Sequence, residues 1–74
     1  MLERIMEIVT ESLGTDAELT AETRFNEDLG ADSLDVFQII MGIEETFDVE
    51  IDNEEVEKIV TVGDAVEQIK NALN

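Results

Sequence analysis

The chain has 74 residues with 20 acidic and 4 basic side chains and a formal net charge of −16, a balance that excludes nucleic acids and anionic membranes as partners and favours basic protein patches. It contains no Cys and no His, which excludes a disulfide framework and removes the commonest general base and metal ligand. No apolar run has transmembrane length and the first residues do not resemble a signal peptide. We therefore expect a monomeric cytoplasmic protein, without membrane insertion, that forms a single domain over residues 1–74.

The N-terminal segment is predicted to be an amphipathic helix. Its apolar residues recur at helical spacing: Leu2, Ile5, Met6, Val9 and Leu13. Gly14 follows and is a typical residue at a helix C-terminus.

A polar, aperiodic segment runs from Thr15 to Asp32, which is long for a structureless loop in a small domain. Leu19, Phe25 and Leu29 are its large apolar residues. We expect these three side chains to fold the loop back onto the core.

A second helix is predicted from Ser33 to Phe47. Asp32 is a preferred N-cap residue, and Asp35 stands where a capping box would use its carboxylate. Ser33 is then the first helical residue, beside unpaired backbone N–H groups and the positive end of the helix dipole. Such a position favours a phosphate ester, although serine is also common at helix starts without any function.

This helix carries two apolar stripes. One stripe contains Val36, Ile40, Ile43 and Phe47, and the other contains Leu34, Phe37 and Met41. A helix on the outside of a small bundle needs only one buried stripe. Two interpretations follow: a central helix buried all round, or a second stripe that is exposed for partners.

The remaining chain predicts a link over residues 48–52, a short helix over residues 53–59 and a last helix that ends near Leu73. Asn53 is a plausible cap for the short helix, and Thr61 with Asp64 forms the pattern of a capping box for the last one. The fold class is therefore all-α: a four-helix bundle with a short third helix and a long loop between helices 1 and 2.

The motif Asp32-Ser33-Leu34, preceded by Leu29-Gly30-Ala31, resembles the attachment site of acyl carrier proteins. The resemblance spans nearly the whole chain, through residues 25–29, 44–51, 56–59 and 61–65. It departs from the family near Asn53, where many members have Pro. The most similar type is the freestanding carrier of bacterial fatty acid synthesis, which is a carrier and not an enzyme.

The resemblance implies that Ser33 carries 4′-phosphopantetheine as a phosphodiester, flanked by Asp32 and Leu34. The thiol of this arm would carry acyl groups as thioesters, and the arm itself would come from coenzyme A through a phosphopantetheinyl transferase. Fatty acid synthesis enzymes would bind through basic patches. The implied partner surface consists of Leu34, Asp35, Phe37, Met41, Glu44, Glu45, Asp48 and Val56. The implied acyl pocket is lined by Phe25, Leu29, Ile43, Phe47, Ile51, Ile59, Ala65 and Ile69.

Other functions fit the sequence less well. A nucleophile elbow needs Gly-x-Ser-x-Gly after a strand, and this pattern is absent around Ser33. An EF-hand starting at Asp48 would have Ile59 at its twelfth position, where a Glu is required. No specific metal site is predicted, although loose cation binding by clustered acids stays open, as does a purely acidic interaction protein. If the protein is a carrier, the alternative to fatty acid synthesis is a dedicated role in a polyketide, peptide or D-alanine transfer pathway.

Overall fold

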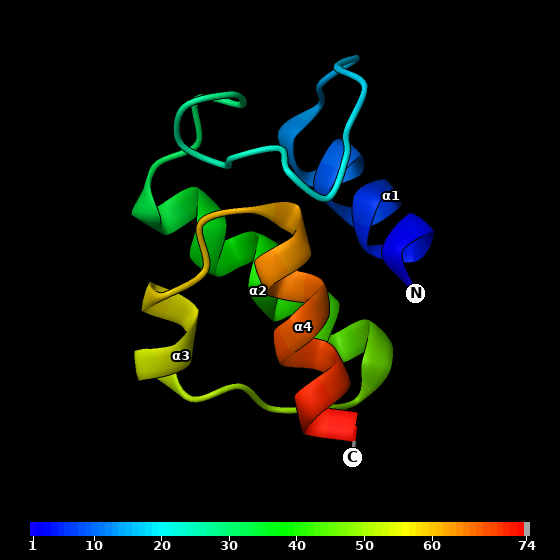
Figure 1. Ribbon diagram of the computed structural model, residues 1–74, viewed down its shortest axis with the longest axis vertical. Helices are drawn as coiled ribbons and strands as arrows, with labels where there is room; N and C mark the ends of the chain where they lie inside the picture. The colour runs from blue at the N-terminus through cyan, green and yellow to red at the C-terminus, as the bar shows by residue number, and fades with distance from the viewer. Residues whose placement is uncertain (74) are drawn as a thin grey trace.

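The computed structural model describes residues 1–73, and this part of the chain folds into four α-helices (Figure 1). They are α1 (Leu2–Leu13), α2 (Ser33–Phe47), α3 (Asn53–Glu57) and α4 (Val62–Leu73). The all-α bundle with a short third helix and a long loop after α1 is thus confirmed. Over residues 1–73, none of the helices has the length and apolar character that a membrane span requires.

The ends of the helices follow the local signals in the sequence. Gly14 terminates α1 in the left-handed conformation with φ of 61°, and its N–H donates to Thr10 O. Asp48 ends α2 in the same way, with φ of 56° and a hydrogen bond from its N–H to Glu44 O. At α4, the predicted capping box is present, because Asp64 N–H donates to Thr61 Oγ1 while Thr61 N–H donates to Asp64 Oδ2.

The short helix α3 differs from the prediction at both ends. Its N-cap is Asp52 and not Asn53, and no side chain caps it. The α-helix stops at Glu57, because Lys58 N–H donates to Glu55 O and Ile59 N–H to Val56 O. These i to i−3 hydrogen bonds tighten the last turn and end the regular α-helix two residues earlier than expected.

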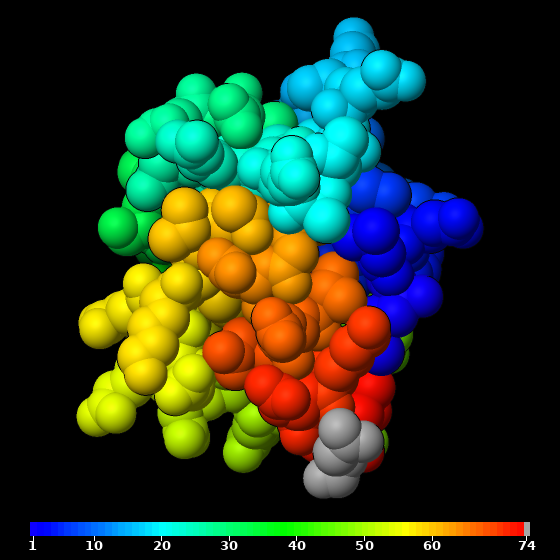
Figure 2. Space-filling view, viewed as in Figure 1, coloured from blue at the N-terminus to red at the C-terminus, as the bar shows by residue number. Residues whose placement is uncertain are grey.

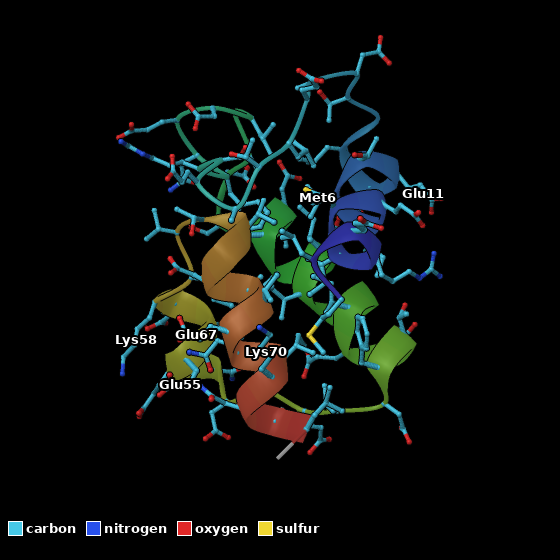
Figure 3. All side chains as sticks on the ribbon, turned by 45° about the vertical axis from the view of Figure 1, so that its right-hand side comes forward. Met6, Glu11, Glu55, Lys58, Glu67 and Lys70 are labelled. Atoms are coloured by element: carbon cyan, nitrogen blue, oxygen red, sulfur yellow. The ribbon has the colours of Figure 1, made fainter. Side chains whose placement is uncertain are left out.

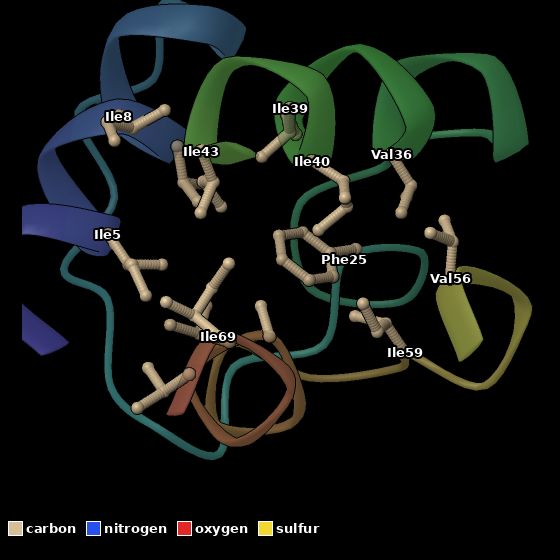
Figure 4. Close-up of a cluster of buried hydrophobic side chains, with 14 of the residues drawn as sticks. Ile5, Ile8, Phe25, Val36, Ile39, Ile40, Ile43, Val56, Ile59 and Ile69 are labelled. Atoms are coloured by element: carbon tan, nitrogen blue, oxygen red, sulfur yellow. The ribbon is translucent and has the colours of Figure 1, made fainter. Parts of the chain in front are cut away.

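The core lies where α1, α2 and α4 meet, and Figure 4 shows Phe25 of the loop in the middle of its side chains. The side chains with no exposed surface are Ile5, Val9, Ile43, Val62, Ala65 and Ile69. Leu29, Phe47 and Ile51 pack against this cluster and are half-buried. One helix face each from α1 and α4 is buried, as their amphipathic patterns predict.

The loop between α1 and α2 folds back onto the core, as Leu19, Phe25 and Leu29 predict. Phe25 is 1% exposed, and the other two are half-buried against the cluster. The loop is also hydrogen-bonded to the segment before α4: Phe25 N–H donates to Val60 O at 3.0 Å, and Val62 N–H donates to Thr23 O at 3.0 Å. Figure 2 shows the loop lying directly on the start of α4.

Candidate functional site

The site is built at the start of α2, where the predicted capping box is complete. Asp35 N–H donates to Asp32 Oδ1 at 2.9 Å, and Asp32 N–H donates to Asp35 Oδ2 at 3.3 Å. These reciprocal bonds fix the first turn of a helix of 15 residues. Ser33 is therefore held at the first helical position.

The residues before the cap anchor this end of α2 in the core. Ala31 is 4% exposed, and its N–H donates to Phe25 O at 2.9 Å. Gly30 turns the chain with φ of 67°, in the left-handed region that favours glycine. The buried alanine and the left-handed glycine together fix where the exposed Ser33 emerges.

Ser33 is exposed, and the structure gives its hydroxyl no hydrogen-bond partner among residues 1–73. A hollow of about 140 Å³ lies next to it, between the loop, α2 and α3. Asn26, Phe37, Glu57 and Ile59 are among the residues that line this hollow with Ser33. An accessible hydroxyl at a helix N-terminus suits a phosphodiester, because the unpaired N–H groups and the dipole favour the negative charge.

The second apolar stripe of α2 faces outward. Leu34 is 65% exposed and Met41 is 56% exposed, whereas Phe37 is half-buried. The interpretation of α2 as a central helix that is buried on all sides is therefore wrong at Leu34 and Met41. The acidic residues Glu45 and Asp48 are exposed on the same helix and at its end, and Asp35 is half-buried by the cap.

Glu44 has a structural role that the sequence did not indicate. Its Oε2 accepts a hydrogen bond from Ile51 N–H at 2.7 Å, across seven residues. The carboxylate thereby holds the link between α2 and α3, which has no regular structure of its own. No periodic pattern reveals a contact of this kind, although a Glu one turn before an extended link could have suggested it.

Val56 was expected on the partner surface and is instead part of the core. Its side chain is 4% exposed and packs with Val36 and Ile59, near which it lies in Figure 4. Helix α3 is only five residues long, so its one inward side is used to attach it to the bundle. The exposed candidates for partner contact therefore come from α2 and its C-terminal end.

The eight residues expected to line an acyl pocket form a packed core in this conformation. Phe25, Ile43, Ile59, Ala65 and Ile69 are buried, and the other three pack against them. Ile59 also lines the hollow beside Ser33. An acyl chain in this region would have to part the side chains.

The acidic side chains do not converge on a metal site. Within residues 1–73, no group of three His, Cys, Asp or Glu side chains is placed to hold an ion.

Comparison with known proteins decides the family. A family model described as "Phosphopantetheine attachment site" matches residues 3–69. The acyl carrier protein of Clostridium acetobutylicum is 48% identical over 71 residues, which cover 95% of this chain and 92% of that protein. The chain belongs to the acyl carrier protein family.

Solved structures of acyl carrier proteins have the same fold. A chain from Mycobacterium tuberculosis described as an acyl carrier protein has a TM-score of 0.89 at 36% identity and covers 95% of each chain. The acyl carrier protein of Thermotoga maritima has a TM-score of 0.84 at 34% identity, with 97% of this chain and 85% of that one covered.

Acyl carrier proteins are carriers and not catalysts, and they bear covalently attached 4′-phosphopantetheine, which is therefore the cofactor of this carrier protein. The family also acts together with a phosphopantetheinyl transferase and with enzymes of fatty acid synthesis. The start of α2 fits such a group, because it offers an exposed hydroxyl at a capped helix N-terminus. An acidic cation-binding protein has no comparable support.

Proposed function

We propose that Ser33 is the residue to which 4′-phosphopantetheine is attached, and that the protein carries growing acyl chains in cytoplasmic fatty acid synthesis as one domain over residues 1–74. The observation that carries this proposal is the position of Ser33, exposed and first in α2 behind the Asp32–Asp35 capping box. The cofactor supplies a thiol on a long arm. Because α2 is fixed in the core, the arm has a rigid base and a free end.

Partner enzymes would bind the surface around the base of this arm. The exposed Leu34 and Met41 provide an apolar centre, with Phe37 between them partly covered. Asp35, Glu45 and Asp48 provide an acidic rim. Such a rim steers basic patches and speeds association, while the apolar centre lengthens the life of the complex.

The acyl chain would be sheltered by the side chains next to the hollow beside Ser33. Ile59 lines this hollow and also belongs to the core cluster, so the hollow and the core are continuous there. An acyl chain that parts α2 and α3 at this point would reach Phe25 and Ile43. Burying the acyl chain would be favourable because its apolar surface leaves water.

The fatty acid role is tested by loading. The protein bearing phosphopantetheine is incubated with malonyl-coenzyme A and a bacterial malonyl transferase, and its intact mass is recorded. We expect one malonyl addition that depends on the arm. Efficient loading by a D-alanine or amino acid ligase, with no malonyl transfer, would instead assign the protein to another carrier pathway.

A further inference from the structure

A second surface lies on α1, away from the start of α2. A groove of about 490 Å³ runs between α1 and the loop that follows it. We call it the α1 groove; Met6, Ala17 and Leu19 form its apolar part, and Glu3, Glu7 and Glu11 form its acidic part. It shares no lining residue with the hollow beside Ser33.

The acidic part of the groove is a regular row on one helix. Glu3, Glu7 and Glu11 are spaced by four residues, so the row is about 12 Å long at the rise of an α-helix. Like charges at this spacing destabilise a helix. Within residues 1–73, only Glu7 of the three has an ion-pair partner, Arg4 at 3.0 Å, and both of these side chains are more than half exposed. The three glutamates therefore contribute little to the stability of the fold.

The apolar part lies beside this row and is open to solvent. Met6 and Leu19 pack against the core from its edge and are half-buried, while Ala17 is exposed. The Thr15 hydroxyl accepts a hydrogen bond from Ala17 N–H at 3.1 Å, which shapes the loop at this point. Figure 3 labels Met6 and Glu11, one residue from each part of the groove.

We propose that the α1 groove is a docking site for a cationic amphipathic helix of a partner protein. Lys or Arg residues four positions apart on such a helix match the spacing of the three carboxylates. The apolar face of the same helix would cover Met6 and Leu19, in the manner of helix-in-groove recognition. A second copy of this chain is disfavoured as the occupant, because its net charge of −16 repels an acidic row.

The probe is a synthetic amidated 15-residue helix with Lys at every fourth position and Leu along the adjoining face. It is titrated into the ¹⁵N-labelled full chain without phosphopantetheine and followed by NMR. A peptide of the same composition, permuted so that neither residue type forms a stripe, is the control. We expect shifts centred on residues 3–11 and 17–19, and little effect from the control peptide.

Two variant pairs test the site. Glu3→Gln/Glu11→Gln should weaken binding about fivefold at low salt, whereas Glu54→Gln/Glu67→Gln, which removes the same net charge from exposed positions elsewhere, should change it less than twofold. Ala17→Arg should weaken binding, and Ala72→Arg, at an exposed position on α4, should not. Equal losses in both charge pairs, or shifts centred on α2, would overturn the proposal. Because the titrated protein carries no phosphopantetheine, the outcome does not depend on whether the arm is attached at Ser33.

Discussion

Ile40 and Met41 are neighbours on α2 with opposite surroundings. Ile40 is 1% exposed and Met41 is 56% exposed. Ile40→Ala should lower the free energy of unfolding by about 2–5 kcal/mol, because it leaves a cavity. Met41→Ala should change it by less than about 1 kcal/mol and still slow acyl transfer by partner enzymes. Denaturant unfolding and transfer rates measure both effects; a large loss of stability in Met41→Ala would place this side chain in the core.

Glu44 and Glu45 form a second informative pair. Glu44→Ala removes the acceptor of Ile51 N–H and should lower the free energy of unfolding by about 1 kcal/mol. Glu45→Ala, at an exposed position, should stay within about 0.5 kcal/mol. Denaturant unfolding of both variants makes the comparison, and equal stability would show that the bond to Ile51 contributes nothing. A charge change at Glu45 is consequently the cleaner probe of partner steering.

At the scale of the elements, the contact between the loop and α4 limits what can replace Gly63. Its N–H donates to Ala21 O at 2.8 Å, and a Cβ at this position would lie 2.9 Å from the same oxygen. Gly63→Ala should therefore lower the melting temperature, although alanine is the better helix former by about 1 kcal/mol.

Gly42 provides the matched control for this substitution. A Cβ there would meet Ile8 Cγ2 at 3.7 Å, an ordinary contact, so Gly42→Ala should leave the melting temperature unchanged or raise it. Thermal unfolding followed by circular dichroism compares the two variants. If both raise the melting temperature, the loop does not hold α4 closely.

The helices were predictable from sequence because their signals are local. The apolar spacing of α1 and α4, Gly14, and the capping patterns of Asp32 with Asp35 and Thr61 with Asp64 all act within a few residues. The bond from Phe25 N–H to Val60 O joins residues far apart in the chain, and no pattern encodes it. Val56 is 4% exposed, as the spacing of Val56 and Ile59 on the short helix indicates, and only the resemblance to the family placed it on the partner surface.

At the scale of the whole molecule, the proposed shelter for the acyl chain requires a core that holds the fold and can still admit the chain. A small domain with a charge of −16 has little stability to spare. A bound acyl chain should therefore raise the melting temperature by several degrees over the form with the free arm, and more for longer chains up to a limit. Thermal unfolding of a series of acylated forms measures this, with an acetylated arm as control. Equal melting temperatures across the series would argue against an internal acyl site.

The central claim is that Ser33 alone receives the arm, and intact-mass measurement tests it most directly. The protein is incubated with coenzyme A, magnesium and a phosphopantetheinyl transferase, beside Ser33→Ala and the control Ser12→Ala near the end of α1. Wild type and Ser12→Ala should each gain one phosphopantetheinyl group, and Ser33→Ala should gain none while keeping its helical circular dichroism spectrum. A phosphopantetheinyl addition that persists in Ser33→Ala would contradict the account.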